Sequence, residues 1–77
     1  MKLIIINGPN LNLLGEREPE IYGSETLEQV NKWIENHELC IDLELEFFQS
    51  NSEGELIDFL HSKRKSVDYC ILNAGAL

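Results

Sequence analysis

Two apolar runs near the ends of the chain constrain the fold more than any other feature. Lys2–Asn7 (KLIIIN) is a nearly continuous apolar run with β-branched residues, and Val67–Asn73 (VDYCILN) is again mostly apolar. Runs of this kind are typical of strands that are covered on both faces, as in a parallel sheet. We therefore predict that both runs are interior strands.

Two helices are predicted between these runs. Each begins with a capping box, in which a Ser or Thr is followed three residues later by Glu or Gln: TLEQ at Thr26 and SEGE at Ser52. The first helix is expected to end near His37 and the second near Lys63. Apolar side chains recur at helical spacing in both. These are Leu27, Val30, Trp33 and Ile34 in the first helix, and Leu56, Ile57, Phe59 and Leu60 in the second.

A further strand is predicted over Cys40–Gln49, where apolar and acidic residues alternate. Alternation with period two is typical of a strand with one solvated face, and such a strand suits the edge of a sheet. The apolar face would carry Ile41, Leu43, Leu45 and Phe47, and the solvated face Asp42, Glu44 and Glu46.

The resulting order, strand-helix-strand-helix-strand, indicates an α/β fold with parallel strands and right-handed helical crossovers. The edge character of the second strand gives the spatial order 2-1-3 of a flavodoxin-like sheet, with helices on opposite faces. Residues 1–77 allow one domain at most. The third strand has interior character but no further strand to pair with. We therefore interpret residues 1–77 as the N-terminal part of a single domain, or as a chain that borrows the rest from a partner. The isolated chain is expected to be poorly stable or self-associating.

Composition and charge exclude several classes of protein. The net charge of −8, from 14 acidic and 6 basic residues, argues against a nucleic-acid partner, which requires a basic surface. No apolar run approaches the ~20 residues of a membrane span, and MKLIII is too short for a signal peptide, so a cytoplasmic location is expected. Cys40 and Cys70 lack metal-site spacing and should lie about 10 Å apart, too far for a disulfide. Both are predicted to be small buried hydrophobes.

The connection between the first strand and the first helix, Asn7–Gly23, is much longer than the roughly 2–6 residues usual for such loops. It carries too many apolar residues to be disordered, so it is a candidate active-site loop. It starts at the carboxyl end of the first strand, next to the end of the third, where α/β proteins bind ligands. We therefore expect Asn10 and Asn73 to lie close together and to face one crevice.

The residue types in this loop exclude some chemistries and leave others open. Neither of the phosphate-binding patterns GxGxxG and GxxxxGK[ST] occurs, and no lysine looks buried, which disfavours Schiff-base chemistry. Arg17 and Tyr22 are the reactive side chains of the loop. Taken alone, Arg17 better suits a surface ion pair with a neighbouring glutamate, and Tyr22 better suits a packed aromatic at a rim. Asn10 equally suits a residue that only shapes the turn.

Three segments together resemble one family. NGPNLNLLGEREPEIYGSETL, EFFQSNSEGELIDFLH and ILNAGAL look like the type II 3-dehydroquinate dehydratases of the shikimate pathway, with a match along the whole chain. The resemblance covers about the first half of the family's length. It implies a flavodoxin-like fold, homo-oligomers in which trimers assemble into dodecamers, and 3-dehydroquinate as the small-molecule substrate. It also implies that no metal and no cofactor take part.

The resemblance also implies a mechanism, which is an anti elimination of water through an enolate. Tyr22 matches the tyrosine that abstracts a proton from C2 of the substrate, and Arg17 matches the arginine that activates it. Asn73 matches an asparagine that contacts the substrate. Asn10 matches one that helps to hold a water near the enolate.

The end of the chain departs from the family pattern. The family's later histidine, which protonates the leaving hydroxyl, and a later arginine that grips the substrate have no counterpart here, and His37 and His61 match neither. The 77 residues alone are therefore expected to be inactive. The alternative is a non-catalytic flavodoxin-like binding or assembly module derived from this enzyme. The sequence directly downstream would discriminate between the two.

Overall fold

The computed structural model describes residues 1–16, 20 and 23–77, and its elements follow the predicted order. Two short 3₁₀ turns interrupt the connections on either side of the first helix. The elements are β1 (Lys2–Asn7), η1 (Leu11–Leu13), α2 (Leu27–Glu35), η2 (Glu38–Cys40), β2 (Glu44–Gln49), α3 (Glu53–Lys63) and β3 (Tyr69–Asn73).

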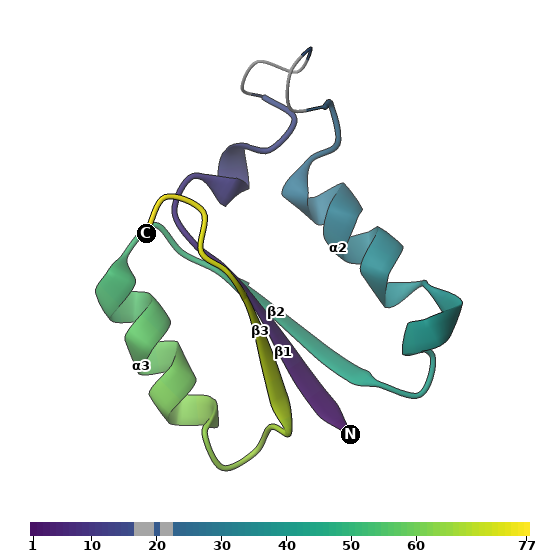
Figure 1. Cartoon of the computed structure of the whole chain (residues 1–77), viewed down its shortest axis with the longest axis vertical. Coiled ribbons are helices and arrows are strands. Elements are labelled where there is room, and N and C mark those ends of the chain that lie inside the picture. The colour runs from purple at the N-terminus through teal and green to yellow at the C-terminus, as the bar shows by residue number, and fades with distance from the viewer. Residues whose placement is uncertain (17–19, 21–22) are drawn as a thin grey trace.

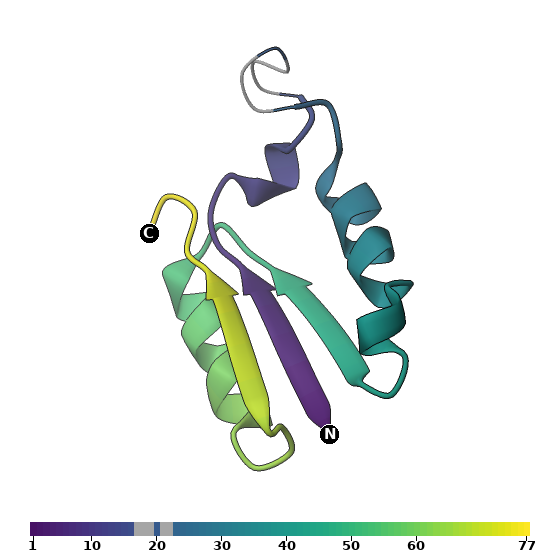
Figure 2. The same cartoon turned by 45° about the vertical axis from the view of Figure 1, so that its right-hand side comes forward.

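The three strands form one parallel sheet in the order β2-β1-β3, which confirms the predicted order 2-1-3. Figure 1 shows α3 on one side of this sheet and α2 on the other, so the prediction of helices on opposite faces is also confirmed. In the register of the sheet, Asn7 of β1 pairs with Gln49 of β2 and with Asn73 of β3. The carboxyl ends of all three strands therefore lie level at one edge, below η1 and the C-terminal residues (Figure 2).

The core lies between the sheet and α3. Ile4, Ile6 and Leu56 are almost fully buried there, with no more than 3% of their surface exposed. The rings of Phe48 and Phe59 stack beside them with their centroids 4.2 Å apart. Burial of each such side chain contributes about 1.5–3 kcal/mol. This packing holds β1 rigidly, and the loop that follows Asn7 therefore starts from a fixed point.

The capping boxes explain why the helices begin where they do. The Thr26 backbone N–H donates to Gln29 Oε1 at 2.9 Å, and Thr26 Oγ1 accepts from the Gln29 N–H at 3.2 Å, so the first box is complete. At α3 only half of the predicted box forms, since Ser52 Oγ accepts from the Glu55 N–H at 3.3 Å. The Glu55 carboxylate instead accepts from Ser50 Oγ at 2.6 Å, which ties the end of β2 to the first turn of α3.

The second strand begins at Glu44, not at Cys40 as predicted. β1 begins at Lys2, which pairs with Glu44, so residues 40–43 have no neighbouring strand to bond to. They turn instead. The Leu39 N–H donates to His37 Nδ1 at 3.1 Å, and the Leu43 N–H donates to the Cys40 carbonyl at 3.0 Å. The predicted strand is therefore four residues too long at its amino end.

The prediction that both cysteines are buried was wrong. Cys40 is half-buried in η2, and Cys70 is exposed on β3. Cys70 lies on β3, one of the two edge strands of the sheet, and no described strand pairs with the outer edge of β3. Trp33 was also misplaced on the apolar stripe of α2. It is 67% exposed, because it lies one residue, and so about 100°, from Ile34 around the helix. Its ring packs edge-on against the His37 ring, with the ring centroids 5.3 Å apart.

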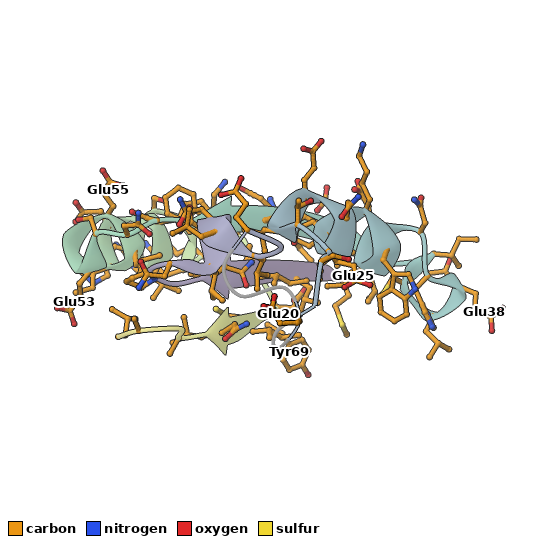
Figure 3. The ribbon with its side chains drawn as sticks, turned by 90° about the horizontal axis from the view of Figure 1, so that it is seen from above. Glu20, Glu25, Glu38, Glu53, Glu55 and Tyr69 are labelled. Carbon is orange, nitrogen blue, oxygen red and sulfur yellow. The ribbon has the colours of Figure 1, made fainter. Side chains whose placement is uncertain are left out.

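β3 exposes apolar side chains at the edge of the sheet. Tyr69, Ile71 and Leu72 are between 52% and 60% exposed. Figure 3 shows Tyr69 projecting away from the other strands. A long apolar edge is a template for pairing with another chain. We therefore expect sedimentation equilibrium of the 77-residue chain to show association that rises with concentration, and Ile71→Lys to weaken it. A monomer with a sharp unfolding transition would contradict this expectation.

Glu46 makes an ion-pair network at the amino end of the sheet. Its Oε1 lies 3.0 Å from Lys63 Nζ and 3.2 Å from Lys2 Nζ, so this carboxylate, predicted on a solvated face, is partly covered by α3. The hydrogen bond from Lys63, and then that from Lys2, holds the pKa of Glu46 below its usual value, against an opposing effect of desolvation.

This lowered pKa predicts a loss of stability in acid. A carboxyl group whose pKa is lower in the folded than in the unfolded chain stabilises the fold above the unfolded pKa of about 4.5, and this contribution is lost as the pH falls through the folded pKa. We expect Glu46→Gln to lower the free energy of unfolding by about 0.5–1 kcal/mol at pH 7 and by progressively less as the pH falls below the unfolded pKa of about 4.5. Urea unfolding of the parent chain and of Glu46→Gln, from pH 7 to below pH 4.5, measures this difference in the free energy of unfolding. Glu28→Gln, whose pair with Lys32 is far more exposed, is the control and should change little. An equal loss at every pH would contradict the assignment.

Candidate active site

The site is built where the carboxyl ends of β1 and β3 meet. The Gly8 N–H donates to the Asn73 carbonyl at 2.9 Å, which extends the pairing of the two strands by one residue. The Ser50 N–H donates to the Asn7 carbonyl at 3.2 Å on the other side of β1. Three segments that are far apart in the sequence therefore leave the sheet side by side. The meeting of the segments after β1 and β3 was predicted, and the segment after β2 joins them.

Two glycines allow the segments after β1 and β3 to touch. A Cβ on Gly8 would lie 2.2 Å from the Ala74 carbonyl oxygen, so only glycine fits without a shift of the backbone. Gly75 has a φ of 59°, and a Cβ there would lie 2.7 Å from the Pro9 carbonyl oxygen. The same Pro9 carbonyl accepts from the Ala76 N–H at 3.4 Å. The two loops thus form one continuous floor.

A cavity of about 280 Å³ opens on this floor. Its volume lies just below the ~300–1,000 Å³ typical of small-molecule sites. Among the described lining residues, Asn10 supplies the one polar side chain, and the rest of the lining is apolar or glycine. The lining residues are Pro9, Asn10, Leu11, Leu13, Leu14, Gly15, Gly75 and Ala76.

Asn10 is held in an unusual conformation at the mouth of the loop. Its φ of 70° places it in the left-handed region, which asparagine tolerates better than most residues. Its carbonyl accepts from the Leu13 N–H at 3.0 Å and so starts η1. Its own N–H donates to Asn51 Oδ1 at 2.9 Å. The turn is therefore tied both to η1 and to the segment after β2.

Of the four predicted site residues, Asn10 and Asn73 lie in the described part of the chain. Asn10 lines the cavity, and Asn73 ends β3 with its carbonyl bonded to Gly8, so the segments that carry both residues converge. Asn73 does not itself line the described cavity, and the meeting of the two side chains stays a prediction. Arg17 and Tyr22 lie outside the described residues, so their roles also stay predictions.

Gln49 and Asn51 were not predicted as site residues, although they also contact this loop. Gln49 Nε2 donates to the Gly8 carbonyl at 3.3 Å and to Asn51 Oδ1 at 3.2 Å. The signal that would have found them is topological, because Gln49 ends β2 and Asn51 follows it at the same sheet edge as Asn7 and Asn73.

The described residues offer few reactive side chains at this site. Desolvation in β3 raises the pKa of the Cys70 thiol, which disfavours the nucleophilic thiolate although the residue as a whole is exposed. Across residues 1–16, 20 and 23–77, no group of three or more His, Cys, Asp or Glu side chains is arranged to hold a metal ion.

None of the described helices is long and apolar enough to cross a membrane.

Solved structures share this fold. The type II dehydroquinase from Butyrivibrio crossotus superposes with a TM-score of 0.89 at 42% identity, over 99% of this chain and 53% of that one. The type II dehydroquinase from Propionibacterium acnes superposes with a TM-score of 0.82 at 29% identity, over 94% of this chain and 50% of that one.

Sequence comparison leads to the same family. The chain is 50% identical over 76 residues to a 3-dehydroquinate dehydratase of Halothermothrix orenii, and 54% identical over 76 residues to one of Prochlorococcus marinus. Each alignment covers 99% of this chain and 51% of the relative, so the chain spans about half the length of the curated relatives that it matches. The model of the family described as dehydroquinase class II matches residues 1–77. This chain therefore belongs to the class II dehydroquinase family.

Proposed function

We propose that this chain supplies the N-terminal half of an active site that removes water from 3-dehydroquinate to give 3-dehydroshikimate. The observation that carries the proposal is the cavity at the junction of β1 and β3, which is lined by Asn10 and by further residues of the segment between β1 and α2. The sequence of that segment also contains Arg17 and Tyr22. The names of the relatives support the same reaction, since they are 3-dehydroquinate dehydratases.

In the proposed reaction Tyr22 is the general base and Arg17 activates it. A free phenol has a pKa near 10, so only about one in a thousand is ionised at pH 7. A useful base at neutral pH requires a pKa about 2–3 units lower, which corresponds to about 3–4 kcal/mol. An adjacent guanidinium lowers a pKa by about 1–3 units, and a closed, water-poor loop strengthens that effect.

The asparagines serve the enolate that forms when the proton leaves C2. Asn10 holds a water near the enolate oxygen, and Asn73 binds the substrate. A neutral amide suits this task because it donates hydrogen bonds to developing negative charge without carrying a charge of its own. The apolar leucines that line the rest of the cavity exclude bulk water, which strengthens these hydrogen bonds. No metal or cofactor enters the proposed reaction.

The leaving hydroxyl is protonated by a histidine in the half of the family's length that this chain does not span. The 77 residues alone are therefore proposed to lack turnover, because they hold the base of the acid–base pair without the acid.

The proposed enzyme is a cytoplasmic homo-oligomer, built from trimers that assemble into a dodecamer.

The test joins residues 1–77 to the second half of the Halothermothrix orenii relative, a product hereafter called the joined polypeptide. We expect it to convert 3-dehydroquinate into the conjugated enone product, which ultraviolet absorbance follows, while the 77-residue chain does not. A folded joined polypeptide without turnover would overturn the proposal. Turnover by the isolated chain would overturn its second part.

A further inference from the structure

The segment after β2 reaches across the sheet edge to the loop after β1. Asn51 Oδ1 accepts two hydrogen bonds, one from the Asn10 backbone N–H at 2.9 Å and one from Gln49 Nε2 at 3.2 Å. Gln49 Nε2 also donates to the Gly8 carbonyl at 3.3 Å. These contacts bridge 41 residues of sequence and connect β2 to both sides of Pro9.

The contact matters because of the conformation of Asn10. It is the one residue other than glycine with a positive φ in the described part of the chain. Such a conformation persists only where the surroundings favour it. The Asn10 carbonyl is already used by η1, and its N–H has Asn51 as its acceptor. Without Asn51 this N–H has no protein partner to hold the turn.

Gln49 explains why the oxygen of Asn51, and not its NH₂ group, faces Asn10. Gln49 Nε2 is a donor, so it requires an acceptor on Asn51. The Asn10 N–H is a donor too and requires the same. Both contacts therefore select one orientation of the Asn51 amide.

We infer that Asn51 is a positioning residue. Its side-chain oxygen, oriented by Gln49, accepts from the Asn10 backbone N–H and so holds the turn at Asn10. This turn sets where the side-chain amide of Asn10 lines the cavity. The consequence for turnover rests on the proposed function. The positioning itself rests on the contacts alone, so the two are tested separately.

The first test measures hydrogen exchange at single amides of the joined polypeptide by NMR. In Asn51→Ala the Asn10 amide should exchange about five- to tenfold faster, because it loses its acceptor. The amides of Gly8 and Ser50, which donate to backbone carbonyls, should stay within about twofold of the parent. Asn51→Asp keeps an acceptor oxygen and should restore slow exchange at Asn10. The control Asn36→Ala removes an exposed asparagine whose backbone caps α2.

Each outcome decides the inference. An unchanged Asn10 amide in Asn51→Ala would overturn it. So would an equal acceleration of all amides, a failure of Asn51→Ala to fold, or identical behaviour of Asn51→Asp and Asn51→Ala, since these assign Asn51 to general stability or to nothing.

The second test uses the joined polypeptide. We expect Asn51→Ala to lower kcat about tenfold with a smaller change in KM, because a misplaced Asn10 affects the enolate more than the bound substrate. Asn36→Ala should leave both unchanged. Normal kcat in Asn51→Ala would remove the link to catalysis while the proposed function stands. If the parent joined polypeptide itself lacks turnover, the proposed function fails, and the exchange measurements still decide the positioning.

Discussion

Replacing Tyr22 by phenylalanine is expected to lower the turnover number of the joined polypeptide by at least about 10²- to 10⁴-fold, the effect of losing a general acid or base. The substitution keeps the aromatic ring and removes only the ionisable hydroxyl, so the fold should be retained. KM should change far less, since the lost interaction acts mainly in the transition state. Steady-state kinetics measures both parameters.

Tyr69→Phe is the matched control for this prediction. Tyr69 is the other tyrosine of the chain, it is 60% exposed, and it lies at the amino end of β3, away from the cavity. Its loss of a hydroxyl should leave turnover unchanged. Near-normal turnover in Tyr22→Phe would remove the proposed base. A covalent adduct on a lysine, trapped by borohydride with substrate, would replace the enolate route by an imine.

Arg17→Ala separates activation of the base from the base itself. A neighbouring cation favours the ionised phenol, so its removal should raise the pKa of Tyr22 towards that of a free phenol. Turnover near neutral pH should fall, and the low-pH limb of the pH–rate profile, which reports deprotonation of the general base, should move to higher pH. An unshifted profile would assign Arg17 to the surface ion pair that its neighbouring glutamates also allow.

Replacing Gly8 by alanine is expected to lower the free energy of unfolding by about 2–3 kcal/mol. The added Cβ would lie 2.2 Å from the Ala74 carbonyl oxygen and 2.9 Å from the Ala74 carbonyl carbon. Both are backbone atoms, so no side chain is able to rotate away, and the loops after β1 and β3 must separate. Urea unfolding of the joined polypeptide measures the loss.

Gly54→Ala is the control for the added methyl group. The nearest atom to a Cβ on Gly54 is Ser52 Oγ at 3.8 Å, an ordinary contact, and Gly54 lies in α3. Alanine there should raise stability by about 0.5–1 kcal/mol, since it has a higher helix propensity. Equal effects of the two substitutions would show that the Gly8–Ala74 approach does not constrain the fold. We also expect Gly8→Ala to reduce turnover, because the cavity floor is made of these two loops.

The fold was predictable because its signals are local. The apolar runs of β1 and β3 indicated parallel strands, and the alternating segment before Gln49 indicated an edge strand, which together placed β1 in the centre. The capping residue Thr26 predicted the start of α2 correctly, since both of its hydrogen bonds lie within three residues.

The errors arose where a long-range partner decides the outcome. The alternating pattern is as regular over residues 40–43 as over Glu44–Gln49, but only the latter has β1 beside it. Cysteine is a residue type that is usually buried, yet Cys70 is exposed. Its exposure depends on whether another strand pairs with β3 and not on the sequence of β3. Local pattern carries no information about either neighbour.

The sequence by itself determined the strand order, the helix starts and the edge of the sheet where a ligand site belongs, because hydrophobic periodicity and capping act over a few residues. Only the tertiary structure decided that Gly8 must contact Ala74, that Asn10 turns with a positive φ, and that Asn51 holds it there. These contacts join residues 41 or more positions apart. They depend on the register in which the three parallel strands end, and no local pattern specifies that register.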